Sequence, residues 1–476
     1  MKACRIADHR MIEVDGRCFL FLPAQNAIFE VEEGIRSLID IYSRSRNRLN
    51  ADVLQLKEYP PAEPLRSLIG LRVVVPEEND PVPPWSPSAE IPMQTLVLHL
   101  TDSCNLDCVY CYHGAKEDFS GKCAVMDHKT AVRGVDLLME KSGDQDAVTL
   151  VLFGGEPLLC FREIKKIAAY ARKKASEYHK KLRLALTTNG VLLTEEIVQF
   201  IRDEEISVTV SIDGPADIQD RYRPFPGGKP SFTAVSGGVE RLIRNRGQQP
   251  IAARVTVARS PAHVTSTLDY LLEMGFSEVG FSPVTTLEAG YQLDEEAMNG
   301  LLGQFQQLSE RFLTAAQYGD LLGFTNLIDL LVNLHEGQVK THPCGAGLGM
   351  FSVGVDGRLY LCQRLTGSGR FAMGNVYDGI DNNRVIPFRE KSSLENRTGC
   401  HPCPARSICA GGCYHEALIR QGSLTTPNRH YCRWIRKWLD IGLYTYARLC
   451  LENIDYLDKL SLLRGHAPFQ PKAFMH

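Results

Sequence analysis

Residues 101–114 read TDSCNLDCVYCYHG, and this stretch decides the fold. It holds three cysteines, spaced Cys104-x3-Cys108-x2-Cys111, directly after a strand-like run. Three closely spaced thiolates suit an iron–sulfur cluster, and a cluster with three protein ligands keeps one iron open to a small molecule. A structural zinc site would need a fourth ligand nearby, for which His113 is a candidate.

Strand-like and helical patterns alternate from Met93 to about Pro283. The strand-like runs are Leu96–Leu100, Thr149–Phe153, Leu182–Thr187, Val208–Ile212, Ala253–Val257 and Glu278–Ser282. Helical patterns between them include His128–Lys141, Glu163–His179, Thr194–Arg202 and Val264–Met274. This alternation predicts an α/β fold with a parallel sheet and right-handed crossovers. Six repeats favour an open, partial (β/α)6 TIM-type barrel, whose active site faces the C-terminal ends of the strands.

The first cysteine group, followed by the aromatic Tyr112, resembles the signature of the radical S-adenosylmethionine (SAM) superfamily. The resemblance continues at the ends of the next strands with GGEP, TNG and SIDG motifs, and then with an arginine in the sequence DRYR. It implies a set of SAM contacts: Tyr112, Gly154, Gly155, Glu156, Thr188, Asn189, Ser211, Asp213 and Arg223. In that family a reduced [4Fe–4S] cluster, here on the first three cysteines, cleaves SAM. The resulting 5′-deoxyadenosyl radical abstracts a hydrogen atom from the substrate.

Seven further cysteines lie between residues 344 and 432, and their spacing resembles the SPASM extension of radical SAM peptide-modifying enzymes. The resemblance implies two auxiliary [4Fe–4S] clusters, for three clusters in all. It assigns Cys344, Cys362 and Cys413 to the first auxiliary cluster, and Cys400, Cys403, Cys409 and Cys432 to the second. The first then needs a non-cysteine ligand or keeps an iron open to a substrate thiolate. Two zinc sites of the Cys4 type are the alternative.

The chain divides into six segments. Residues 1–76 are predicted as an N-terminal winged-helix-like domain with strands at Cys18–Leu22 and Ala27–Val31 and a helix at Gly34–Ser43. Then follow a proline-rich and acidic linker (77–92), the radical SAM core (93–284), a helical bridge (285–343), the SPASM domain (344–433) and a C-terminal helical tail (434–476). Resemblance to peptide maturases implies that the first domain recognises a peptide by strand addition, and a structural cap is the alternative.

Composition excludes several partner classes. The net charge of −3 gives no general attraction to nucleic acid, and no apolar run approaches the roughly 18 residues of a membrane span. The N-terminal MKACRIADHR has charges where a secretory signal needs apolar residues. Clustered thiols without such a signal predict a cytoplasmic protein with metal ligands rather than disulfides. The isolated cysteines (Cys4, Cys18, Cys123, Cys160 and Cys450) are interpreted as small buried apolar residues.

The segment CAGGCYHEALIRQGSLTTPNRHYCRWIRKW, residues 409–438, resembles the maturases of quinohemoprotein amine dehydrogenase. That resemblance implies thioether crosslinks between cysteine sulfur and Asp or Glu methylene carbons of a small cysteine-rich subunit. It also implies an electron donor such as flavodoxin or ferredoxin, and an escort for the peptide. The alternatives are formylglycine formation as in anaerobic sulfatase maturases, sactipeptide-type linkage to an α-carbon, or a non-enzymatic metal-binding assembly scaffold. The sequence identifies no catalytic base.

Overall fold

A ten-stranded sheet forms the centre of the computed structural model, which describes residues 4–44, 68–76, 90–112, 124–247, 249–259 and 263–465. Its strand order is β11-β10-β9-β8-β7-β6-β12-β13-β14-β15. The first six are parallel: β6 (Thr95–His99), β7 (Ala147–Phe153), β8 (Lys181–Thr188), β9 (Ser207–Ser211), β10 (Ile251–Val257) and β11 (Glu278–Pro283). The six predicted strands and the partial barrel are therefore confirmed.

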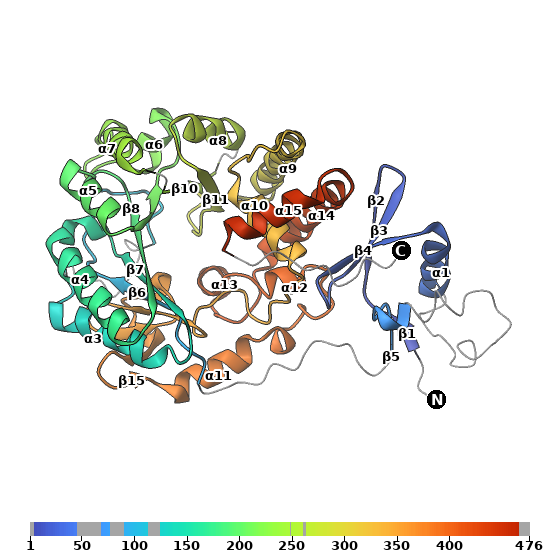
Figure 1. The fold of residues 1–476 in the computed structure, drawn as a ribbon, viewed down its shortest axis with the longest axis horizontal. Helices are drawn as coiled ribbons and strands as arrows, with labels where there is room; N and C mark the ends of the chain where they lie inside the picture. The colour runs from blue at the N-terminus through green and yellow to red at the C-terminus, as the bar shows by residue number, and fades with distance from the viewer. Residues whose placement is uncertain are drawn as a thin grey trace.

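Helices cover the outer face of these strands (Figure 1). They are α3 (His128–Lys141), α4 (Phe161–Glu177), α5 (Glu195–Asp203), α6 (Ala216–Tyr222), α7 (Phe232–Asn245) and α8 (Val264–Glu273). Val148, Leu150 and Leu152 of β7 are buried, and they alternate with half-buried residues that face the inside of the barrel. The four predicted helices are confirmed, and α6 and α7 are two additional helices in the single crossover between β9 and β10.

The sheet continues into the C-terminal cysteine region. Strand β12 (Met350–Val353) pairs in parallel with β6, and β13 (Arg358–Tyr360), β14 (Ala372–Asn375) and β15 (Gly379–Ile380) follow in antiparallel order. Phe351 and Val353 are buried, so β12 covers an edge of β6 that would otherwise be open. The predicted loop-rich SPASM segment is thus joined to the barrel by main-chain hydrogen bonds.

Helices of the bridge and the tail pack against each other beside β11. They are α9 (Glu295–Gln317), α10 (Thr325–His335), α14 (Arg429–Glu452) and α15 (Ile454–Leu463), while α11 (Asn382–Ser392), α12 (Arg406–Cys409) and α13 (Tyr414–Gln421) lie in the cysteine region. Phe305 of α9 contacts Phe324 and Trp438 edge-on, with ring centroids 4.9 and 5.0 Å apart. These aromatic contacts join the bridge to the tail.

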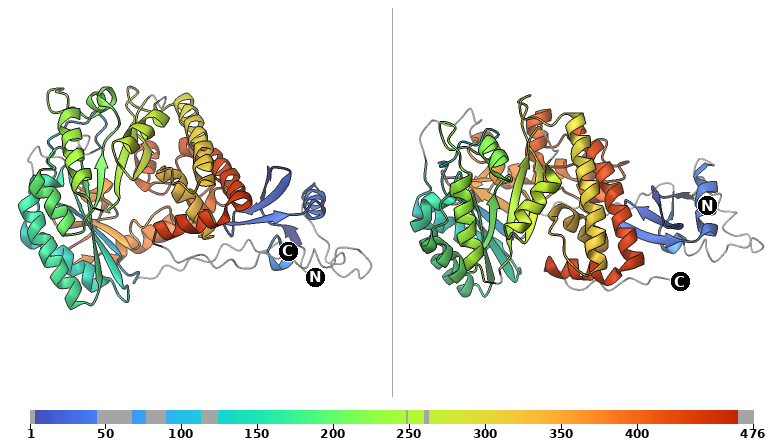
Figure 2. Two further views of the ribbon diagram at one scale, coloured as in Figure 1. Left: turned by 45° about the horizontal axis from the view of Figure 1, so that its top comes forward. Right: turned by 90° about the horizontal axis from the view of Figure 1, so that it is seen from above.

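The N-terminal unit lies beyond α14 (Figure 2). Strands β2 (Arg10–Val14), β3 (Arg17–Leu22) and β4 (Ala27–Val31) form an antiparallel sheet, α1 (Glu33–Arg44) follows, and β1 (Cys4–Ile6) pairs with β5 (Val74–Pro76). The two predicted strands and the helix are confirmed. Buried Asn26 anchors the unit, because its side-chain amide donates to the carbonyl of Asn333 (2.7 Å).

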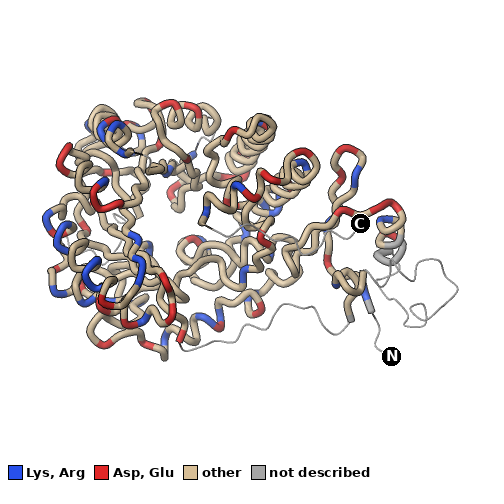
Figure 3. The backbone as a smooth tube through the Cα atoms, in the orientation of Figure 1, with Lys and Arg blue, Asp and Glu red and all other residues tan. Residues whose placement is uncertain are grey.

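Several predictions lie outside the described residues: linker residues 77–89, His113 and Cys123. In the part of the chain that is described, no helix combines the length and apolar character needed to cross a bilayer. Acidic and basic residues are interspersed over the outer helices (Figure 3), in agreement with a small net charge.

Candidate active site

The loop with the first three cysteines is fixed at both ends by main-chain hydrogen bonds. At its start Leu100 donates to Phe153 of β7 (2.8 Å). Further along, the N–H groups of Asp107 and Val109 donate to carbonyls of residues 224 and 222, at the end of α6 (2.8 and 3.0 Å). The loop is therefore held in place by the barrel itself.

The three thiols of this loop influence one another. The pKa of the Cys108 thiol is raised to about 12, mainly by burial, with Arg223 opposing the shift and the neighbouring charges of Cys111 and Cys104 adding to it. Thiolates in this arrangement need a cation to hold them ionised. Three neighbouring thiols therefore fit a metal cluster rather than a redox dithiol.

The GGE segment after β7 lies directly against this loop. The N–H groups of Gly155 and Glu156 donate to the carbonyls of Thr101 (2.7 Å) and Ser103 (2.9 Å). A Cβ on Gly155 would lie 2.2 Å from the carbonyl oxygen of Ser103, so only glycine fits. The exposed edge of this segment is main chain, which a ligand can approach closely.

Glu156 joins the ends of β7 and β8. Its carboxylate accepts hydrogen bonds from the Thr188 hydroxyl (2.8 Å) and from the N–H groups of Leu158 (3.0 Å) and Asn189 (2.7 Å). Burial raises its pKa to about 7 in spite of these three donors. The carboxylate is occupied by its own strand ends, and its direct contact with the SAM amino group stays a prediction.

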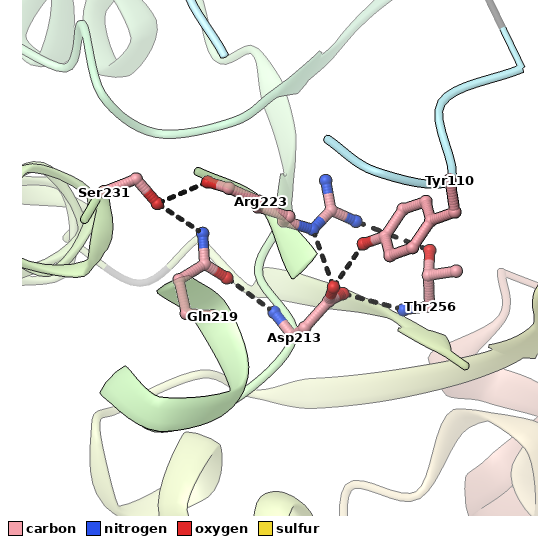
Figure 4. A network of polar contacts seen from close by, with 6 residues as sticks. All are labelled: Tyr110, Asp213, Gln219, Arg223, Ser231 and Thr256. Atoms are coloured by element: carbon pink, nitrogen blue, oxygen red, sulfur yellow. Dashed lines mark hydrogen bonds and ion pairs between the residues drawn. The ribbon is translucent and has the colours of Figure 1, made fainter. Parts of the chain in front are cut away.

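Asp213 organises the opposite side of the barrel mouth (Figure 4). It pairs with Arg223 (Nε to Oδ2, 3.1 Å) and accepts hydrogen bonds from the Tyr110 hydroxyl and from the N–H of Thr256 (2.9 Å). Its own N–H donates to Gln219 (3.0 Å). Only 2% of Asp213 is exposed, so it positions Arg223. Tyr110 was not predicted from the sequence, although its place between Cys108 and Cys111 was the available signal.

A cavity of about 200 Å³ opens at the C-terminal ends of the strands. Its lining includes all the predicted residues of the first site except Asp213: Cys104, Cys108, Cys111, Tyr112, Gly154, Gly155, Glu156, Thr188, Asn189, Ser211 and Arg223. The three thiols, the glycine main chain and the hydroxyl and amide groups fit a three-ligand [4Fe–4S] cluster with SAM beside it. The sequence analysis missed further lining residues, among them Arg254, Thr256 and Arg364.

Residues 98–256 match the model of the Radical SAM superfamily. This part of the chain is a radical SAM domain. The matched residues run from β6 to β10 and therefore contain the cysteine loop, the GGE segment and the Asp213 network. The match explains the first cysteine group as part of an enzyme, so it argues against the alternative of a non-enzymatic metal-binding scaffold.

This radical SAM enzyme has relatives along most of its length. It is 25% identical over 342 residues to a serine-type anaerobic sulfatase-maturating enzyme of Klebsiella aerogenes, covering 69% of this chain and 81% of the relative. A cysteine-type enzyme of Clostridium perfringens is 24% identical over 374 residues, covering 75% and 97%. The structure of anSMEcpe with bound AdoMet and the Kp18Cys peptide superposes with a TM-score of 0.63 at 21% identity, over 77% of this chain and all of that one. The narrower resemblance to amine dehydrogenase maturases gains no support from these relatives.

The second cysteine group of the radical SAM enzyme separates into two sets. The pKa of Cys362 is raised to about 12, mainly by burial, with the charges of Cys413 and Cys344 contributing to the shift. Burial likewise raises the pKa of Cys409 to about 12, and the thiols that add to this effect belong to a different set: Cys432, Cys400 and Cys403. The two neighbourhoods coincide with the two ligand sets that the SPASM resemblance implies.

These thiols are not arranged for single ions. Within the described ranges, no three side chains of His, Cys, Asp or Glu converge as one bound metal ion would require. A cluster with its irons at separate corners needs its thiolates further apart than zinc does. Iron–sulfur clusters on these two sets stay a prediction, with two Cys4 zinc sites as the alternative.

Proposed function

We propose that this radical SAM enzyme modifies a side chain of a peptide or protein. The observation that carries the proposal is that one cavity joins both cysteine regions. Cys111 lines it from the first region, and Arg364, two residues after Cys362, lines it from the second. A substrate side chain there lies between the SAM site and the auxiliary region, and the peptide in the anSMEcpe structure supports this class of substrate.

The first cysteines and the two auxiliary sets have different roles in this proposal. Cys104, Cys108 and Cys111 would hold a [4Fe–4S] cluster beside SAM, and this pair would supply the radical chemistry that removes a hydrogen atom from the substrate. The chain fixes the geometry: Gly155 presents main chain, Glu156 holds two strand ends together, and the buried carboxylate behind Arg223 fixes its guanidinium. We assign the two thiol sets of the C-terminal region to auxiliary clusters, which accept the electron that the product releases.

Formylglycine formation is the reaction that the relatives support. Two of them are sulfatase-maturating enzymes of the serine and cysteine types. Oxidation of a serine or cysteine side chain to an aldehyde also removes a proton, for which a base is needed. Among the described residues that line the cavity, the one carboxylate is Glu156, and its oxygens already accept three hydrogen bonds.

Thioether formation between a cysteine and an Asp or Glu methylene carbon is the second candidate. Arg254 and Arg364 favour it, because two guanidinium groups in the cavity wall suit a carboxylate-bearing substrate. The product has lost two hydrogen atoms. One leaves as a hydrogen atom to form 5′-deoxyadenosine, and the other leaves as a proton plus an electron that passes to an oxidised iron–sulfur centre.

Mass spectrometry of peptide products tests both reactions. The anaerobically reconstituted full chain is incubated with a reductant, SAM and either the Kp18Cys peptide or a peptide containing one cysteine and one aspartate. A thioether gives a loss of two hydrogens and no alkylatable thiol, whereas formylglycine reacts with hydrazides. Fragmentation separates a bond to a methylene carbon from a bond to an α-carbon. Cleavage of SAM coupled to a small metabolite, and to no peptide, would contradict a maturase.

The N-terminal sheet supplies a peptide-binding edge in this proposal. Strand β3 is central, β2 packs on α14, and β4 forms the other edge of the sheet. An extended peptide could add to β4 through main-chain hydrogen bonds. Hydrogen exchange of the full chain with a bound substrate peptide should then show protection of β4 and none of β2. Protection confined to the barrel would favour a structural cap.

A further inference from the structure

A buried arginine lies beside the two thiol sets of the C-terminal region. Arg397 directly follows η4 (Leu394–Asn396) and is only 2% exposed. Its Nε donates to the carbonyl of Ser392 (3.0 Å), whereas its buried Nη1 and Nη2 have no hydrogen-bond partner in the part of the chain that the structure describes. A buried cation with two unused donor nitrogens destabilises a fold unless a ligand accepts from them. Arg397 therefore indicates a bound group beside it.

The main chain that connects the two thiol sets packs against this side chain. Gly411 lies between Cys409 of the second set and Cys413 of the first. A Cβ on Gly411 would be 2.2 Å from Nη1 and 2.4 Å from Cδ of Arg397, and the φ of Gly411 is +93°. Only glycine combines this conformation with such a close approach. The guanidinium thus lies directly against the turn that leads from one set to the other.

Tyr414, the residue after Cys413, also contacts the guanidinium. The centre of its ring lies 5.0 Å from the guanidinium carbon of Arg397. Burial raises the pKa of the Tyr414 hydroxyl, and Ser392 and Arg397 oppose this rise. A neutral ring stabilises a cation over its face but does not neutralise it. The positive charge of Arg397 therefore remains available to the thiols.

Thiols of both sets face this charge. Burial raises the pKa of Cys344 in the first set and of Cys400 in the second, and Arg397 opposes the rise at each of them. Burial lowers the pKa of His342, and the charges of Arg397 and Arg389 lower it as well. The groups that can compensate Arg397 are thus thiolates, one from each set.

Other cations of this region differ from Arg397 in reach or in burial. Arg364 acts on thiols of the first set and Arg436 on thiols of the second. Lys340 acts on one thiol of each set, but it is only half-buried. Arg397 combines burial, contact with the connecting turn and two unused donors. It is therefore placed to act on both sets from within the fold.

We propose that the two Nη groups of Arg397 donate hydrogen bonds to sulfur atoms of both auxiliary clusters and raise the reduction potential of each. This inference rests on the proposed function, in which the two thiol sets hold clusters that accept the electron released by the product. A reduced cluster carries one more negative charge than an oxidised one. A buried cation and N–H donors to sulfur therefore stabilise the reduced form. One shared arginine keeps both centres able to accept that electron.

Redox titration of the reconstituted full chain, followed by electron paramagnetic resonance, tests this role. The first cluster is recognised because its spectrum changes when SAM is added, and its potential should not move. In Arg397→Gln the ratio of reduced to oxidised cluster at a fixed potential should fall about tenfold for both auxiliary clusters, which is about 59 mV for one electron. Arg436→Gln should lower the potential of the second auxiliary cluster only. Arg389→Gln removes another buried arginine, which donates to Gly347 (2.7 Å), and should change neither potential.

Arg397→Lys guards against a folding defect, because it keeps the charge and loses the forked geometry. Iron and sulfide analysis shows whether each variant retains its clusters. If Arg397→Gln loses auxiliary iron, Arg397→Lys decides the question, and its two auxiliary potentials should fall by a smaller amount.

Unchanged auxiliary potentials in the variant that retains its clusters would overturn the inference, and so would a fall in only one of them. Zinc in place of iron at the two sets of the unmodified chain would overturn it as well. Failure of the maturase function is seen separately, as the expected shifts in potential in an enzyme that changes no peptide in mass.

Discussion

The loop that carries Cys104, Cys108 and Cys111 follows a strand of the parallel sheet. By contrast, Cys409 ends a helix of four residues and Cys413 precedes a helix of eight residues. The first loop takes its shape from hydrogen bonds to β7 and to the end of α6. It can therefore form before any metal binds. Cys432 lies in the first turn of α14 and Cys362 follows β13, but Cys400, Cys403, Cys409 and Cys413 lie in turns or at the ends of short helices. We therefore expect a bound cluster to contribute more to the local order of these four cysteines.

Buried arginines partly replace that framework in the C-terminal region. Arg389 donates to the carbonyl of Gly347 (2.7 Å), Arg397 donates to that of Ser392 (3.0 Å), and Arg406 donates to that of His401 (2.8 Å). These three side chains are among the largest that are fully buried. Arginine side chains thus donate hydrogen bonds to main-chain carbonyls in loops and at the end of α11. The difference teaches that the first three cysteines are positioned by the sheet and its crossovers, whereas the C-terminal cysteines depend more on side-chain hydrogen bonds.

Removal of a catalytic cysteine should give the largest effect. Cys108→Ala should lower reductive SAM cleavage by roughly a thousandfold or more, because the cluster loses one of three ligands. Formation of 5′-deoxyadenosine, measured by chromatography, checks this. Cys18→Ala, in the N-terminal sheet, is the matched control and should retain cleavage. Substantial turnover in Cys108→Ala would show that these thiols do not hold the reactive cluster.

Removal of iron should give the next largest effect, a different change in hydrogen exchange in the two regions. We expect hydrogen exchange across residues 400–432 to accelerate by roughly a thousandfold after chelation, since metal binding supplies folding free energy there. The strands β6 to β11 should change far less. Mass spectrometry of peptic fragments measures both in one sample. Equal acceleration in strands and cysteine region would contradict the distinction between a preformed and a cluster-dependent site.

The ion pair behind the barrel cavity should have the next largest effect. Asp213→Asn leaves the buried guanidinium of Arg223 without its counter-charge, which should cost about 3 kcal/mol of unfolding free energy. Denaturant unfolding followed by circular dichroism measures this loss. Asp217→Asn, at an exposed position in α6, should be close to neutral. If the two variants were equally stable, Asp213 would not be the residue that positions Arg223.

Sequence patterns were sufficient for the barrel because each strand is followed by a polar cap and an amphipathic helix. The hydrophobic run of β6 and the GGEP motif after β7 locate the strand ends, and the strand ends locate the site. Strand β12 could not be predicted, since MFSV is too short to distinguish from a loop and is specified by the open edge of β6. Tertiary pairing, not local propensity, makes it a strand.

Polar partners across the cavity were harder to predict than its cysteines. The spacing of the cysteines is local, but the pairing of Asp213 with Tyr110 joins residues 103 positions apart. Arg254 is one of many arginines in the sequence, and its place opposite Arg364 depends on both the barrel and the C-terminal region. Motifs thus located the residues that we expect to hold the cofactor, whereas the groups that would select the substrate required the fold.

The smallest effect concerns helix capping in the two regions. Asp127 caps α3 of the barrel by accepting a hydrogen bond from the Thr130 N–H (2.9 Å), and Asp381 caps α11 in the same way through Asn383 (3.0 Å). Each aspartate-to-alanine change should cost about 1 kcal/mol. Hydrogen bonds from the N–H and hydroxyl of Thr130 lower the pKa of Asp127 below its ordinary 3.8. The contribution of the Asp127 cap is therefore present above that ordinary value and is lost as the pH falls through the lowered one. Unfolding curves of the wild type and Asp127→Ala should accordingly converge in acid. A difference in stability that persists at the lowest pH would show that the cap acts through packing and not through its charge.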